Sequence, residues 1–173
     1  MKISEYRARK TYFKKSFFEI WHLIVIRITE EIMATKTAIV KHIKGVTFIG
    51  KADSNHWVTM DGPENFGGSE AGTRPKELLL IALGGCTGSD VATILQKKKI
   101  KLDGFEMNIS ADVQETHPQV FTKIHLEYVF YGKDIPKDAV ERAIKLSQDT
   151  YCSVTAMLQK AVEINHSFKI IEN

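Results

Sequence analysis

Two cysteines are the residues of this sequence most suited to chemistry. Cys86 lies in the middle of the most apolar stretch of the chain, and Cys152 follows 66 positions later. We expect Cys152 in the first turn of a helix, where the positive end of the helix dipole favours the thiolate and lowers the thiol pKa. If the two sulfurs meet in space, they form the pair of attacking and resolving thiols that redox cysteines use.

The neighbours of Cys86 fit more than one role. Gly84, Gly85 and Gly88 surround it, and each glycine in a helix interior costs about 1 kcal/mol relative to alanine. We therefore expect them to let another helix or a ligand approach closely. Asp90 follows Cys86 by four positions, on the same helical face, where its charge raises a thiol pKa but also suits a cation or an oriented donor. The alternative is that Cys86 is a small buried core residue.

The spacing of glycine, cysteine and histidine residues does not support a nucleotide-binding or a metal-binding site. The glycines at positions 84, 85 and 88 do not form the G-x-G-x-x-G of a dinucleotide site, and the Leu/Ala-rich run before them favours a helix over a strand. No C-x-x-C or H-E-x-x-H is present, and the six histidines show no ligand spacing. A metal site made of Cys86, Asp90, Cys152 and His166 has no paired-ligand spacing behind it. We expect no metal and no cofactor.

Hydrophobic periodicity predicts an α+β fold with a mostly antiparallel sheet. Pro75 opens a long buried helix that runs from Lys76 to about Lys98. Alternation of apolar and polar residues after Gly104 is typical of a half-buried strand. The predicted strands span residues 37–43, 46–52, 56–60, 104–115, 120–131 and 162–170, and two further helices span residues 137–147 and 152–160.

Composition predicts a globular protein with an appendage. The chain has 173 residues, of which 43% are apolar and 26% charged. Residues 1–32 carry seven Lys or Arg and four Asp or Glu, so they hold the whole net charge of +3, which is too weak to indicate nucleic-acid binding. We expect residues 1–32 to form an amphipathic helical extension and residues 33–173 to form one domain.

The extension allows three interpretations. Its apolar stripe suits packing on its own or a partner subunit, which we favour, or lying on a membrane surface. Alternatively, Met33 is the natural start. Charged residues interrupt the apolar stretch near the N-terminus, so we expect neither a signal peptide nor an integral membrane span. Two cysteines are too few for a disulfide scaffold, and we expect a cytoplasmic protein.

Two segments resemble a known family. RPKELLLIALGGCTGSDV at residues 74–91 and YCSVTAMLQKAVEINHS at residues 151–167 are similar to the OsmC/Ohr superfamily, and most of all to its YhfA-like OsmC subgroup. The resemblance covers residues 37–171. It implies an intertwined homodimer, with sheets wrapped around central helices and two active sites at the interface.

The resemblance also implies an activity. Members are cysteine-dependent peroxidases that reduce organic hydroperoxides in the oxidative-stress response. Cys86 would correspond to the peroxidatic cysteine and Cys152 to the resolving cysteine, with a dithiol as reductant. The peroxidase branches place a glutamate directly after the helix-opening proline, linked through an arginine to the reactive thiol.

The sequence departs from that pattern. Lys76 follows the proline, and the acid comes one residue later at Glu77, which is our third candidate catalytic residue. No arginine occurs between Thr37 and Arg74, where Lys51 and His56 are the nearest substitutes. An alternative function is therefore a slow or non-catalytic dimer that binds a redox signal or a small apolar ligand in a pocket floored by Gly84 and Gly85.

Overall fold

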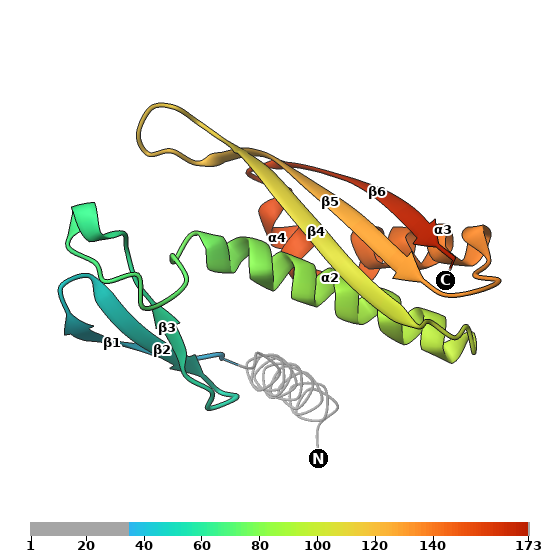
Figure 1. The fold of residues 1–173 in the computed structure, drawn as a ribbon, viewed down its shortest axis with the longest axis horizontal. Helices are drawn as coiled ribbons and strands as arrows, with labels where there is room; N and C mark the ends of the chain where they lie inside the picture. Colours follow the sequence, from blue (N-terminus) through green and yellow to red (C-terminus); the bar gives the residue numbers. More distant parts are fainter. Residues whose placement is uncertain (1–34, 173) are drawn as a thin grey trace, which may run out of the picture. The chain divides into compact units, whose positions relative to one another are not determined.

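The described residues of the computed structural model are 35–172 (Figure 1). They form two compact units, one made of residues 35–44 and 48–59 and the other of residues 45–47 and 60–172. The predicted helix of residues 1–32 and the predicted boundary at residue 33 lie outside the described residues.

A three-stranded sheet occupies the N-terminal part of the described chain. Its strands lie in the order β1 (Ala38–Lys44), β2 (Thr47–Ala52) and β3 (Val58–Met60). These strands match the predicted ones, with β3 beginning two residues late. Several large apolar side chains on and around this sheet are exposed within the single chain, namely Ile39, Val40, Ile43, Phe48, Trp57 and Val58.

A second three-stranded sheet follows in the order β4 (Gly104–Val113), β5 (Phe121–Tyr131) and β6 (Glu163–Ile171). β4 and β5 pair antiparallel, as predicted, but β5 and β6 pair parallel. The expected α+β fold with mostly antiparallel sheets is confirmed, and β6 adds one parallel pair to it. Two helices connect β5 to β6 and return the chain along the sheet, so that β6 starts at the same end as β5.

The helices keep close to their predicted positions. A short 3-10 helix, Glu64–Phe66, precedes α2 (Glu77–Lys97), which is followed after two strands by α3 (Lys137–Leu146) and α4 (Ser153–Leu158). Between α3 and α4 the chain widens into a π-helical turn, Ser147–Tyr151. This turn ends α3 before the predicted Ser147 and moves the start of the next helix beyond Cys152.

The core lies between these helices and one face of the second sheet. Leu126, Tyr128 and Phe130 alternate along β5 and are fully buried, together with Leu83 of α2 and Val140 of α3. Polar residues occupy most of the other face of the sheet, where Val129 is the buried apolar exception on β5. α2 is long and apolar enough to cross a membrane by length and composition. It contributes to this core, but it is only partly buried within the single chain, less than the sequence predicted.

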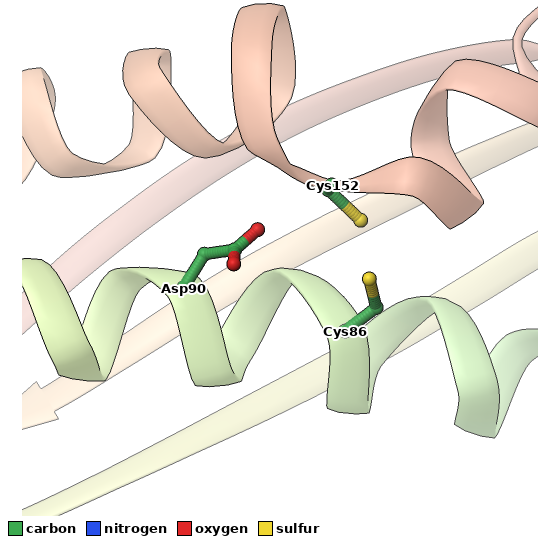
Figure 2. A group of neighbouring side chains, drawn as sticks. All are labelled: Cys86, Asp90 and Cys152. Carbon is green, nitrogen blue, oxygen red and sulfur yellow. The ribbon is translucent and has the colours of Figure 1, made fainter. Parts of the chain in front are cut away.

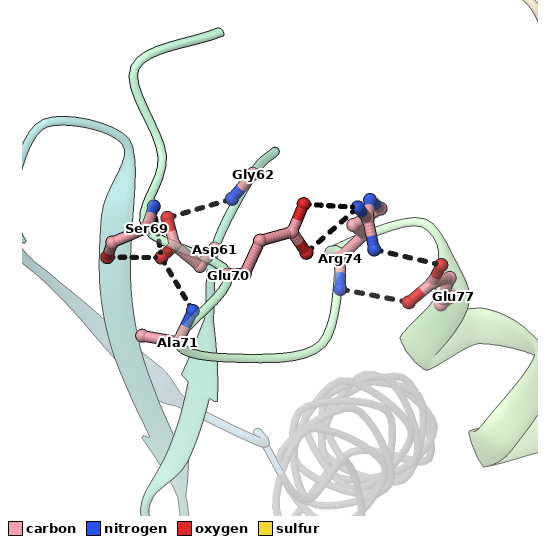
Figure 3. A network of polar contacts seen from close by, with 7 residues as sticks. All are labelled: Asp61, Gly62, Ser69, Glu70, Ala71, Arg74 and Glu77. Carbon is pink, nitrogen blue, oxygen red and sulfur yellow. Dashed lines mark hydrogen bonds and ion pairs between the residues drawn. The ribbon is translucent and has the colours of Figure 1, made fainter. Parts of the chain in front are cut away.

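The loop before α2 is fixed by one buried carboxylate. Asp61 accepts hydrogen bonds from the backbone N–H groups of Gly62 at 2.8 Å, Ser69 at 3.0 Å and Ala71 at 3.0 Å, and from the Ser69 hydroxyl at 2.9 Å (Figure 3). These donors, that of Ala71 above all, hold the pKa of Asp61 far below its ordinary value. The loop therefore delivers the chain to the start of α2 along a defined path.

Candidate active site

The part of α2 that carries Cys86 packs closely against β4. A Cβ added to Gly84 would lie 2.4 Å from Cδ1 of Ile109, so any larger residue there would require the end of the Ile109 side chain to shift. Gly85 has open space around it. Of the two glycines expected to floor a ligand pocket, Gly84 is therefore covered by the sheet, and only Gly85 is open. Cys86 itself is half-buried.

Cys152 occupies the N-cap position of α4. Its Sγ accepts a hydrogen bond from the backbone N–H of Thr155 at 3.4 Å, and the residue is only 2% exposed. Burial raises the thiol pKa, and the hydrogen bond from the Thr155 backbone N–H offsets this only in part. The expectation that the helix start lowers this pKa is therefore wrong, because removal of water disfavours the thiolate more than the short helix favours it.

Cys86, Asp90 and Cys152 converge at one point. The two sulfurs and a carboxylate oxygen of Asp90 all lie within 4.8 Å of one another, and both cysteines are free thiols (Figure 2). The predicted placement of Cys86 and Asp90 on one face of a helix brings both toward Cys152. His166, which the sequence also offered, is not in this group; its ring packs edge-on against Tyr128, with 6.3 Å between centroids.

A buried network of hydroxyl groups holds the two cysteine-bearing segments together. Thr87 lies next to Cys86 in the chain, and its Oγ1 is 2.7 Å from the Tyr128 hydroxyl and 2.9 Å from the Ser147 hydroxyl. The Gln148 side-chain amide donates to both Thr87 and Tyr128. Ser147 also donates to Asp90 at 3.0 Å. The sequence did not predict this network; its one signal is a threonine within a strongly apolar run.

Glu77 lies away from the thiols within one chain. It begins α2, nine residues before Cys86, which corresponds to about 13 Å along a helix. Its carboxylate accepts a hydrogen bond from the backbone N–H of Arg74 at 3.1 Å and lies 3.8 Å from the Arg74 guanidinium, which also pairs with Glu70 (Figure 3). An arginine–carboxylate pair therefore exists, built from two neighbours instead of from a distant strand.

Lys76 stands where the family resemblance leads us to expect a glutamate. Its side chain contacts the segment between β4 and β5 and not the thiols. Its ammonium donates to the backbone carbonyl of Gln119 at 2.9 Å and lies 5.0 Å from the centre of the Phe121 ring. These contacts tie the start of α2 to the β4–β5 turn. Lys51 and His56, the other substitutes considered, belong to the unit of β1 and β2.

A cavity adjoins one of the three converging groups, Asp90. It has a volume of about 500 Å³ and is lined by Asp90 and Tyr151, by apolar side chains of Ile94 and Leu146, and by Lys97 and Lys98 near the end of α2. Asp90 is therefore shared between the thiol cluster and a cavity with both apolar and basic walls.

Comparison with known proteins identifies the family. The model of the OsmC-like proteins matches residues 67–167. The protein YhfA of Escherichia coli K12 is 40% identical over 132 residues, which are 76% of this chain and 96% of YhfA. The chain therefore belongs to the OsmC-like family, as its two cysteine segments indicated.

Solved structures of the same fold agree. A hypothetical protein from Aquifex aeolicus is 30% identical, with a TM-score of 0.71 over 82% of this chain and 99% of that one. A Legionella pneumophila protein described as an organic hydroperoxide resistance protein OsmC has a TM-score of 0.59 and 15% identity, over 79% of this chain and 98% of that one. At that identity the likeness shows a shared fold.

Proposed function

We propose that this protein is a cysteine-dependent peroxidase that reduces organic hydroperoxides in the cytoplasm as part of an oxidative-stress response. The observation that carries the proposal is the approach of two free thiols, 66 positions apart in the chain, to within 4.8 Å. The fold shared with a protein described as conferring organic hydroperoxide resistance supports it. Cys86 acts as the peroxidatic residue and Cys152 as the resolving residue.

The unequal exposure of the thiols supports this assignment. Cys86 is half-buried and within reach of a small molecule, whereas Cys152 is buried and its raised pKa keeps it protonated at neutral pH. The Cys86 thiolate attacks the terminal peroxide oxygen and the O–O bond breaks. The alkoxide leaves and takes up from solvent the proton that the Cys86 thiol had released, which makes it the alcohol. Cys86 is then a sulfenic acid.

The second thiol completes the cycle. Cys152 sulfur attacks the Cys86 sulfenic acid, a disulfide forms, and the hydroxyl leaves as water with the Cys152 proton. Asp90 has a carboxylate oxygen within 4.8 Å of both sulfurs. It accepts the proton from Cys152 and passes it to the leaving hydroxyl. An external dithiol then reduces the disulfide and becomes a disulfide itself, which restores both thiols.

We also propose that the active form is a homodimer. The first sheet leaves large apolar side chains exposed, and Leu79 and Ile81 of α2 are 46% and 58% exposed. Such surfaces mark contacts with another chain. Glu77 lies too far along α2 to reach Cys86 of its own chain, so any catalytic contribution of Glu77 comes from a second copy.

Peroxide turnover tests the proposal. With an alkyl hydroperoxide and a dithiol, the wild-type protein consumes peroxide. Cys86→Ser abolishes consumption while keeping the thermal unfolding midpoint. Cys152→Ser allows one oxidation, stops at the sulfenic acid and over-oxidises with excess peroxide, as intact mass shows. Peroxide consumption insensitive to Cys86→Ser contradicts the proposal.

The cavity supports a second candidate, a dimer that binds a small ligand and senses redox state without turnover. Its apolar and basic lining suits an amphipathic anion. Thiols that remain unchanged in the presence of peroxide, together with ligand binding weakened by changes in the cavity, would favour this candidate.

A further inference from the structure

The reduced site has the donor set of a metal centre. Two sulfurs and a carboxylate oxygen lie within 4.8 Å of one another and point toward a common centre (Figure 2). We infer that Cys86, Cys152 and Asp90 bind one Zn²⁺ ion in the reduced protein, and that the ion blocks both thiols from peroxide. The binding rests on geometry alone; its effect on peroxide reactivity rests on the proposed function.

The spacing suits a tetrahedral zinc ion. Zinc binds thiolate sulfur at about 2.3 Å and carboxylate oxygen at about 2.0–2.2 Å, so ligands of a tetrahedral site lie about 3.5–3.8 Å apart. The three atoms are already within 4.8 Å, and Cys86 and Asp90 share one face of α2. Small side-chain rotations complete the site. The half-buried Cys86 and Asp90 leave a fourth position for water.

Charge favours a cation at this point. Two thiolates and a carboxylate carry three negative charges, and Asp90 forms no ion pair with any residue from 35 to 172. A divalent ion offsets two of the three charges, and soft thiolate ligands select zinc over magnesium or calcium.

Outer donors already hold the ligands. Ser147 donates to Asp90, and the Thr155 backbone N–H donates to Cys152. The Thr155 hydroxyl, three residues after Cys152, is buried and has no hydrogen-bond partner among the described residues. A metal-bound thiolate gives that hydroxyl an acceptor. Such outer contacts orient ligands and tune metal affinity.

Binding changes no oxidation state. Zn²⁺ forms bonds to two sulfurs and one oxygen, and each thiol releases one proton to solvent, so that two protons leave for each ion bound. Affinity therefore falls as pH falls and the thiols retain their protons. In the zinc form neither sulfur has a free thiolate with which to attack a peroxide, so the ion acts as a reversible block.

Cobalt(II) is the spectroscopic probe. Reduced full-length protein, titrated with Co²⁺, should bind one ion per chain with thiolate-to-cobalt charge transfer and tetrahedral d–d absorption, and one equivalent of Zn²⁺ should displace it. Cys86→Ser and Cys152→Ser should lose most of the charge-transfer band. Asp90→Asn should weaken binding at least tenfold. The matched control is Asp149→Asn, which removes an exposed carboxylate paired with Lys145 and should bind as wild type does.

Two results overturn the metal site: a wild-type spectrum without thiolate charge transfer, or Asp90→Asn binding as tightly as wild type. Peroxide oxidation of metal-free and zinc-loaded protein separates this inference from the proposed function. If the metal-free thiols resist peroxide while cobalt binds, the peroxidase proposal fails and the metal site stands. If they oxidise equally fast with and without zinc, the zinc block is wrong and the peroxidase stands.

Discussion

The hydroxyl groups of Thr87 and Ser147 lie 2.9 Å apart in the core, joining the middle of α2 to the turn that leads to Cys152. Thr87 follows Cys86 directly, and Ser147 lies five residues before Cys152. This contact and its bridge to Tyr128 set the positions of the segments that carry the two sulfurs. The distance between the thiols therefore depends on a polar network within an apolar core.

Replacement of Thr87 should loosen that link. Thr87→Val keeps the shape but leaves Tyr128, Ser147 and Gln148 short of a partner, which should lower the free energy of unfolding by about 1–3 kcal/mol. Formation of the Cys86–Cys152 disulfide should also slow. Urea unfolding and the rate of thiol loss measure the two effects. Thr122→Val, an exposed change on β5, should alter neither, and equal effects from both variants would contradict a special role for Thr87.

The two adjacent glycines of α2 should respond oppositely to alanine. Gly85→Ala meets no atom within 4 Å and should stabilise the helix by up to about 1 kcal/mol. Gly84→Ala forces Ile109 to move and should be about 1–3 kcal/mol less stable than Gly85→Ala, as overpacked cores are. Thermal unfolding of both variants tests this. Equal stability would mean that α2 and β4 do not pack as closely as described.

The Asp61 carboxylate should make the stability of its loop depend on acidity. Its folded-state pKa lies below the ordinary value of 3.8, so its contribution is complete above that value and is lost as pH falls through the folded-state pKa. Asp61→Asn should lower the urea midpoint at pH 7. The difference between the urea midpoints of the variant and the wild type should narrow as pH falls below 3.8. A gap that stays constant down to pH 2 would contradict this account.

The N-terminal extension should be dispensable for assembly. We predict that a chain lacking residues 1–32 keeps the oligomeric state of the full chain, since the exposed apolar side chains of β1 and α2 remain. Size-exclusion chromatography with light scattering compares the two chains. A dimeric full chain and a monomeric truncated chain would show that the extension forms part of the interface.

Local patterns predicted much of the fold. Alternation along residues 104–113 identified β4 and its buried face, and the Leu/Ala-rich run identified α2 to within a residue at each end. The parallel pairing of β6 could not be read in this way, because strand direction depends on the path of the intervening helices and not on the strand's own residues. The partner of Gly84 could not be read locally either. We expected a helix or a ligand beside it, and the structure places Ile109 of β4 there.

The site was only partly predictable. Helical spacing placed Cys86 and Asp90 on one face, but no local pattern reports the distance from Cys86 to a residue 66 positions later. The pKa direction at Cys152 was predicted wrongly because sequence shows the helix start but not the depth of burial. The Arg74–Glu77 pair was not predicted, because the family resemblance places the partner arginine in the N-terminal strands.

Identification of the first oxidation product tests the central claim most directly. Metal-free, reduced protein is treated with one equivalent of an alkyl hydroperoxide, quenched by alkylation, and mapped by peptide mass spectrometry without reduction. The account predicts one disulfide joining the Cys86 and Cys152 peptides of the same chain, absent from both serine variants. Two alkylated thiols after treatment, or a disulfide only between chains, would contradict it.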